Sequence, residues 1–248
     1  MSPRYISNDE LFHFVGRNDP TDHEANYQIL LAVLNCGCVS HPPHTSDWGA
    51  HRITINWDKN IFSEELIVPT VTCYCDIPFE TLQIHMKKYG MFGVSFPRSL
   101  LIKYGARPVI YIPLQPSNPH AGWGTIYCET MLHDMEQVWR GFREHLFDPL
   151  DTGSRRSSLG VKPTSKDEAV IAIDDAFVQH FLAYIKPFNS ELADNDPNNF
   201  YSEREWRKFG NLLFQPGEVI RVLAAPDYVE RLKRDRPTYA DKITAAPV

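Results

Sequence analysis

The stretch Pro-Thr-Val-Thr-Cys-Tyr-Cys, residues 69–75, is rich in β-branched residues and indicates a strand. It runs directly into Asp76-Ile77-Pro78, where an acid suits a helix N-cap and a proline suits the first helical turn. The helix that follows is expected to reach Lys88, where Tyr89-Gly90 ends it. A strand and a helix therefore follow each other directly in the middle of the chain.

The same mixture of short elements extends outward in both directions. Strands are expected at residues 10–15, 51–57, 92–96, 108–113, 184–188 and 218–223. Helices are expected at residues 24–35, 97–104, 126–147, 174–183 and 226–234. Because no regular strand-helix-strand rhythm is present, the sequence predicts an α+β fold: a single compact domain with a mixed, mainly antiparallel sheet and peripheral helices.

The expected domain covers residues 1–225, and residues 226–248 are expected to form a terminal helix and a frayed tail. Within the domain, residues 148–166 replace periodic apolar positions with Gly, Ser, Pro and charge. This composition is typical of a linker or a mobile loop.

The composition excludes several classes of protein. An apolar content of 43% over 248 residues supports a buried core. With 31 acidic and 25 basic residues, the net charge of -6 gives no overall attraction to nucleic acid or membrane surfaces. No apolar run is long enough for a signal peptide or a membrane helix, so a cytoplasmic protein without a membrane partner is expected.

The cysteines raise the question of a metal site. An odd number of them, five, in a chain of this size does not indicate a disulfide framework. Thiol and imidazole groups gather in two segments: Cys36, Cys38, His41 and His44, and Cys73 with Cys75. Because this spacing matches no familiar zinc motif, buried thiols are the preferred interpretation and no metal is expected.

The stretch Phe-Tyr-Ser-Glu-Arg-Glu-Trp-Arg, residues 200–207, carries the most concentrated chemistry. As a strand it would place Tyr201, Glu203, Glu205 and Arg207 on one face, with the two carboxylates roughly 7 Å apart. Arg207 could hold Glu205 ionised, and the pair could act as acid and base or orient a ribose hydroxyl. Two alternatives remain: a solvent-facing strand with surface ion pairs, or a helix in which Glu203 and Arg207 pair and the glutamates diverge.

Several motifs, in order, resemble the AbiGi family of abortive-infection (phage resistance) proteins. They are Leu11-Phe12-His13-Phe14, the run Val-Thr-Cys-Tyr-Cys-Asp-Ile-Pro at 71–78, Tyr-Gly-Met-Phe-Gly-Val at 89–94, Tyr-Ile-Lys-Pro-Phe at 184–188, and Tyr-Ser-Glu-Arg-Glu-Trp-Arg at 201–207. The resemblance implies a bacterial antiviral setting and an antitoxin whose partner is a cognate toxin or another defence protein.

A fainter likeness connects the chain with DarT-like and other ADP-ribosyltransferase folds, which begin with a His-bearing strand and end with a Glu-bearing strand. It implies NAD as cofactor, with His13 on the ribose, Tyr74 or Tyr89 on the nicotinamide, and Arg207 completing the cofactor-binding set. The same likeness makes Glu203 or Glu205 the catalytic group that stabilises the transition state. The chain departs from the arginine-directed members because it has His13 where they have arginine.

Two functions therefore follow as hypotheses. In the first, His13 and the glutamate pair meet in one cleft and perform NAD chemistry as part of phage defence. In the second, the chain is a non-enzymatic antitoxin or regulator whose surface binds a toxin or nucleic acid. The basic groups that could contact nucleic acid are Arg155 and Arg156, and Arg231, Lys233, Arg234 and Arg236 in the terminal helix. Interspersed acids make an ordinary charged surface the alternative for the terminal helix.

Overall fold

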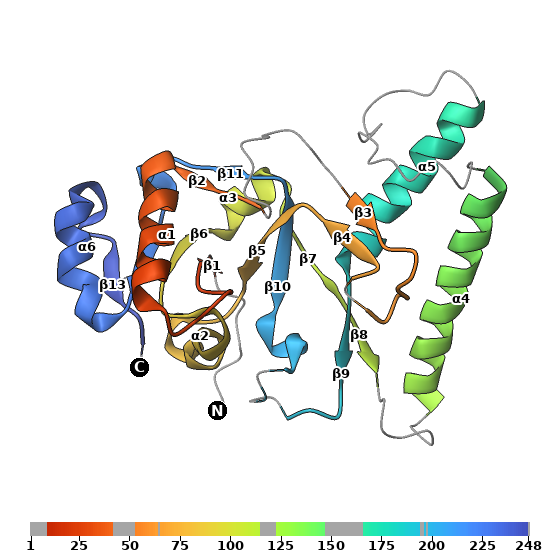
Figure 1. Cartoon of the computed structure of the whole chain (residues 1–248), viewed down its shortest axis with the longest axis horizontal. Helices are drawn as coiled ribbons and strands as arrows, with labels where there is room; N and C mark the ends of the chain where they lie inside the picture. Colours follow the sequence, from red (N-terminus) through yellow and green to blue (C-terminus); the bar gives the residue numbers. More distant parts are fainter. Residues whose placement is uncertain are drawn as a thin grey trace. The chain divides into compact units, whose positions relative to one another are not determined.

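The computed structural model describes residues 9–41, 53–63, 65–114, 123–146, 166–193, 196 and 198–247 (Figure 1). Their contacts form two compact units. Unit 1 comprises Met1–Trp48, Val71–Pro108 and Asp194–Val248, and unit 2 comprises Gly49–Thr70 and Val109–Ala193. Both units mix strands and helices, so the predicted α+β class is confirmed.

Unit 1 is built on a seven-stranded sheet with the order β13-β12-β6-β1-β5-β10-β7. Its central strand, β1 (Glu10–Phe14), pairs antiparallel with β5 and β6 on either side. The strands around it are β5 (Val71–Cys75), β6 (Gly93–Pro97), β7 (Arg107–Pro108), β10 (Glu205–Phe209), β12 (Arg221–Ala224) and β13 (Ile243–Ala245). Since β12 and β13 pair parallel and the other pairs are antiparallel, the predicted mixed, mainly antiparallel sheet is confirmed.

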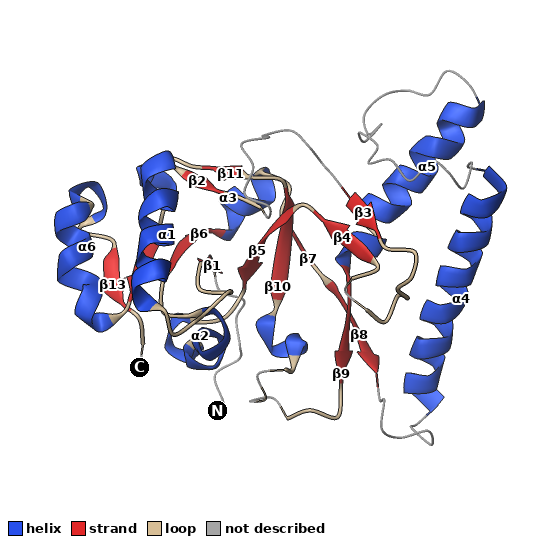
Figure 2. Ribbon diagram, in the orientation of Figure 1, coloured by secondary structure: helices blue, strands red, loops and turns tan. Residues whose placement is uncertain are grey.

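Helices cover both faces of this sheet (Figure 2). On one face, Leu11 and Tyr74 pack into a core with α1 (His23–Cys36), α3 (Arg98–Lys103) and α6 (Val229–Asp235). On the other face, Phe12 and Cys75 pack with Leu82 and with α2 (Gln83–Tyr89), which follows η1 (Phe79–Thr81). Consecutive residues of one strand thus enter different cores, as the alternation of side chains requires. A small ladder of β2 (Cys38–Val39) and β11 (Leu212–Leu213) completes the strands described in unit 1.

Unit 2 contains two strand pairs and two long helices. The pair β3 (Ile53–Ile55) and β4 (Ile67–Pro69) is antiparallel, and the pair β8 (Ile110–Leu114) and β9 (Ile185–Asn189) is parallel. The indole Nε1 of Trp139 on α4 (Trp123–Leu146) donates to Asp174 Oδ1 on α5 (Lys166–His180) over 3.0 Å. This buried hydrogen bond joins the two helices.

No helix in the described part of the chain is long and apolar enough to cross a membrane.

Several expectations are corrected by the structure. The expected helix after Asp76-Ile77-Pro78 begins only at Phe79, because the backbone at Pro78 is still extended with ψ of 143°. It consists of η1 followed by α2. The C-terminal segment contains η6 (Pro237–Tyr239) and β13 instead of a frayed tail, and Tyr239 is buried. Of the expected loop, residues 148–165 lie outside the described residues.

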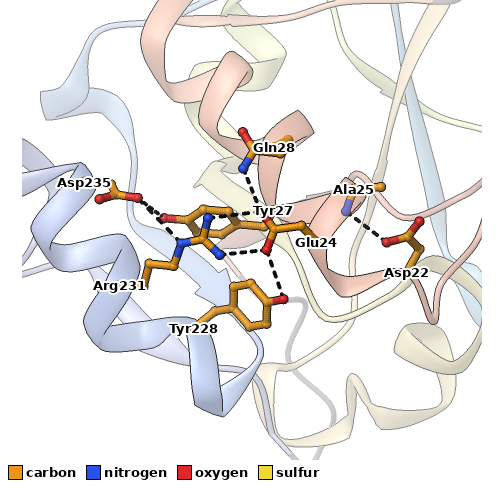
Figure 3. Close-up of polar contacts among 8 residues, drawn as sticks. All are labelled: Asp22, Glu24, Ala25, Tyr27, Gln28, Tyr228, Arg231 and Asp235. Carbon is orange, nitrogen blue, oxygen red and sulfur yellow. Dashed lines mark hydrogen bonds and ion pairs between the residues drawn. The ribbon is translucent and has the colours of Figure 1, made fainter.

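A polar network fastens the C-terminal helix to α1 (Figure 3). Arg231 on α6 donates two hydrogen bonds to the Glu24 carboxylate, over 2.6 and 3.0 Å, and its guanidinium lies 4.3 Å from the Tyr27 ring centroid. Tyr228 OH also donates to Glu24, and Tyr27 OH donates to Asp235 Oδ2 over 2.5 Å. These contacts explain why the chain after residue 225 continues to pack on unit 1.

The Glu24 contact predicts a pH-dependent stability. The hydrogen bonds from Arg231 are the main cause that lowers the pKa of Glu24 from 4.5 to about 2. A carboxyl with a depressed folded pKa contributes stability above its unfolded pKa, and loses it as the pH falls toward the folded value. The stability difference between wild type and Glu24→Gln should therefore shrink between about pH 6 and about pH 3 in urea unfolding.

The matched control for this experiment is Asp227→Asn, which removes an exposed acid from the neighbouring η5 (Pro226–Tyr228). Its stability difference from wild type should change less over the same pH range. Equal pH dependence in both variants would contradict a specific role for the Glu24 pair.

Gly93 on β6 lies against the backbone of β1 with no room for a side chain. A Cβ at this position would lie 2.6 Å from the carbonyl oxygen of His13 and 3.3 Å from Cδ1 of Phe14. We expect Gly93→Ala to lower the free energy of unfolding by about 1–2 kcal/mol, since the two paired strands would have to move apart. Urea unfolding measures this loss, and Gly217→Ala, where the added Cβ meets nothing within 4 Å, should leave stability nearly unchanged.

Candidate functional site

The two most specific motifs of the sequence are neighbours in unit 1. Glu205 at the start of β10 lies opposite Cys75 at the end of β5. The backbone N–H of Asp76 donates to the carbonyl of Arg204 over 3.2 Å, and the Arg204 guanidinium lies 3.7 Å from Asp76 Oδ2. The strand pairing therefore brings residues 75–78 and residues 202–205 together.

Residues 200–207 do not form one strand. Phe200–Glu203 form the short helix η3, whose N-cap Asn199 accepts a hydrogen bond from the Tyr201 N–H over 3.2 Å. Arg204 then adopts the left-handed conformation with φ of 46°. Among the described residues, it is the only one other than glycine that has a positive φ. Because β10 starts only at Glu205, the expected alternation of Glu203 and Glu205 along one strand is wrong. The helical alternative holds for the first half only.

Each of the two glutamates pairs with its own cation. Glu203 is 6% exposed, and its Oε1 accepts hydrogen bonds from Lys88 Nζ over 2.6 Å and from Tyr89 OH over 2.7 Å. Glu205 is 7% exposed, and its carboxylate accepts hydrogen bonds from Nε of Arg207 over 2.7 Å and from Nη2 over 3.3 Å. The expected pairing of Arg207 with Glu205 is thus confirmed. Buried carboxylates need such partners because an unpaired buried charge is costly.

His13 lies on the central strand and bonds to the backbone. Its half-buried ring donates from Nδ1 to the carbonyl of Cys73 over 2.8 Å, and its centroid lies 5.7 Å from that of Tyr74. The ring of Tyr74 is 2% exposed in the core, and burial raises the pKa of its hydroxyl, which donates to Thr72. Tyr89, the other aromatic residue expected at a nicotinamide, is half-buried and bonds to Glu203.

The strand register separates His13 from Glu205. Phe12 pairs with Cys75 across β1 and β5, and Cys75 pairs with Glu205 across β5 and β10. Residues paired in this way point to the same face of a sheet, and the next residue along a strand points to the other face. His13 therefore faces the core that contains Tyr74, whereas Glu205 faces the side of α2. The structure does not bring these two side chains together.

A pocket of about 210 Å³ opens where the two motifs meet α2. We call it the α2 pocket. Its lining combines the end of the 71–78 motif, the outer side of α2 and the turn before β10: Ile77, Pro78, Thr81, Ile84, His85, Lys88, Ser202, Glu203 and Arg204. Among the predicted site residues, Glu203 belongs to this lining, while His13, Tyr74 and Glu205 do not. The sequence interpretation missed Lys88 and Arg204.

The acidic and basic side chains around the α2 pocket differ in their exposure to solvent. The side chains of the acids are nearly inaccessible, at 7% exposure for Glu203 and 5% for Asp76. Their cationic partners are more open, at 28% for Lys88 and 39% for Arg204. Although the four charges balance, the pocket presents mainly positive charge to solvent.

The cysteines and histidines do not assemble a metal site in the part of the chain that the structure describes. No group of three or more His, Cys, Asp or Glu side chains in that part could hold a metal ion. Burial raises the pKa of Cys38 to about 11 and raises that of Cys75 as well, which favours neutral thiols. His44 lies outside the described residues.

Comparison with protein families settles the relationship. The model of the family described as "Putative abortive phage resistance protein AbiGi, antitoxin" matches residues 52–241, which include every residue of the α2 pocket. The chain belongs to the AbiGi family. Membership implies a role in abortive-infection phage defence, and the family is described as an antitoxin. The match confirms the resemblance seen in the sequence. The AbiGi match begins after β1, so His13 lies outside it. Neither the curated proteins nor the solved structures gave a match.

Proposed function

We propose that this AbiGi chain is an antitoxin that neutralises a partner toxin by binding it, and that it does so without NAD chemistry. The observation that supports this most strongly is the separation of the predicted catalytic groups. Glu203 and Glu205 each pair with a different cation, and His13 faces the opposite side of the sheet from Glu205. The NAD hypothesis requires His13 and a glutamate in one cleft, and the strand register does not bring His13 and Glu205 together.

The size of the α2 pocket supports the same choice. Sites for small molecules and cofactors enclose about 300–1,000 Å³ and cover most of the surface of the ligand. At about 210 Å³, the α2 pocket is smaller than this range. It is large enough for one side chain of a protein partner.

The basic terminal helix gives a reason to favour a protein over nucleic acid as the partner. Arg231 pairs with Glu24 over 2.6 Å, and Lys233 pairs with Glu230 over 2.8 Å. These acids offset two of the four positive charges that the sequence places on this segment, which lowers its net attraction for phosphates. We place the binding in the bacterial cytoplasm, because abortive infection acts inside the infected cell.

The test of this function is the stoichiometry of neutralisation. The protein encoded next to this chain is the proposed toxin, and its activity is titrated with the purified chain in the presence and absence of NAD. Neutralisation by binding should be complete at about one antitoxin per toxin and independent of NAD. Neutralisation by a small fraction of that amount, dependent on NAD, would instead establish catalysis.

One observation keeps the NAD-dependent alternative open to test. Glu203 lines the α2 pocket and bonds to Tyr89, which unites two residues of the predicted NAD set. If the chain is an ADP-ribosyltransferase, wild type should release nicotinamide from NAD and Glu203→Gln should not. The absence of nicotinamide release by wild type, with and without the neighbouring protein, rejects this alternative.

A further inference from the structure

We propose that the α2 pocket is the place where the toxin docks, and that it receives an apolar side chain of the toxin that lies next to an acidic one. This inference rests on the proposed antitoxin function and adds the surface and the chemistry of the partner. The occupant is a protein segment with an apolar anchor and a carboxylate beside it.

The apolar part of the α2 pocket defines the apolar side chain of the partner segment. Ile77 and Pro78 come from the segment before η1, and Ile84 from α2, where its side chain is 37% exposed. Partly exposed apolar side chains around a hollow lose contact with water when a partner fills it. Interface anchors that dominate binding are large side chains that fill such small pockets.

The charged side chains at the α2 pocket define the acidic residue of the partner segment. Lys88 and Arg204 are the more exposed members of their ion pairs, whereas Glu203 and Asp76 lie deeper. A carboxylate of the partner would therefore meet the guanidinium of Arg204 and the ammonium of Lys88 before either acid. Such complementarity steers association and selects the partner.

The backbone at Arg204 points to function independently. A non-glycine residue with φ of 46° occupies a conformation that costs free energy, and the surrounding contacts must hold it there. Two contacts do so: the Asp76 N–H bonds to its carbonyl, and its own N–H bonds to the carbonyl of Tyr201. The turn thus fixes an arginine, where glycine would be easier, at the edge of the pocket.

The experiment measures the affinity of the neighbouring gene's protein for two pocket variants. Ile84→Gln removes the apolar wall while keeping a helix-forming residue, and Arg204→Asn removes the charge while asparagine tolerates the left-handed conformation. Each should weaken binding by about 10-fold or more, as expected for a central interface residue. Thermal melts should show that both variants remain folded.

The helix α3 offers matched controls. Ile102 is 54% exposed and Lys103 is also exposed. Ile102→Gln repeats the first substitution outside the α2 pocket, and Lys103→Asn removes one positive charge there. Both should bind the toxin within about twofold of wild type. If both pocket variants bind the toxin as tightly as wild type does, this inference is overturned and the proposed function stays intact. Absence of wild-type binding overturns both.

A second measurement does not depend on the loss of binding. A photo-crosslinking amino acid placed at Ile84 should attach to a toxin peptide in which an apolar residue adjoins Asp or Glu, as mapped by mass spectrometry. The same amino acid at Ile102 should give no such product. Crosslinking at Ile102 but not at Ile84, or to a basic toxin segment, contradicts the proposed docking site.

Discussion

Replacing Arg207 with methionine should lower the free energy of unfolding by about 3–5 kcal/mol, the usual cost of breaking a buried ion pair. Arg207 is 8% exposed and Glu205 7%, and two guanidinium nitrogens contact the two oxygens of that carboxylate. Methionine keeps much of the aliphatic volume, so the lost charge dominates the effect. Urea unfolding followed by circular dichroism measures the change.

Two further variants identify the cause of this loss. Arg98→Met removes a cation whose partner Asp9 is 94% exposed, so it should cost less than about 1 kcal/mol. The double replacement Glu205→Leu and Arg207→Met should recover much of the loss, because the carboxylate no longer remains buried after its guanidinium is gone. A loss for Arg207→Met no greater than that for Arg98→Met would refute the prediction.

Local signals made much of the fold predictable. The helix expected at residues 24–35 is α1, His23–Cys36, and Gly37 ends it in the left-handed conformation with φ of 59°. The apolar period at residues 126–147 predicted α4, which the structure bounds as Trp123–Leu146. Both features depend on neighbours within a few residues, and the sequence displays those neighbours directly.

The left-handed turn at Arg204, between η3 and β10, could not be predicted in this way. Arginine has no preference for the left-handed conformation, and nothing within residues 200–207 marks Arg204 as the break. The contact with Asp76, far away in sequence, supports it. The same limit explains β13, which pairs with β12 through a parallel register that no local pattern reveals.

In the candidate site, too, only the local contacts could be predicted from the sequence. Glu205 and Arg207 stand two residues apart in a strand, and the alternation of side chains was sufficient to pair them. Lys88 and Glu203 are separated by 115 positions, so only the folded chain reveals their contact. The position of His13 depends on the register of three strands, which places it on the other face from Glu205.

Lys88→Met should lower the free energy of unfolding by about 2–3 kcal/mol, somewhat less than Arg207→Met because solvent reaches 28% of the lysine side chain. Tyr89→Phe should cost about 1.5 kcal/mol, since it removes one hydrogen bond to a charged group. Both residues donate to the same Oε1 of Glu203, so their losses should not add. A double-mutant cycle in urea measures a coupling of about 1 kcal/mol.

Lys87→Met is the control for this cycle, because Lys87 is the adjacent exposed lysine on α2 and should cost less than about 0.5 kcal/mol. Additive losses for Lys88→Met and Tyr89→Phe would mean that Glu203 holds them independently. Coupled losses would mean that one buried carboxylate fixes the end of α2 against η3. In that case the wall of the α2 pocket is already formed in the free chain, so binding of a partner there would not have to order it first.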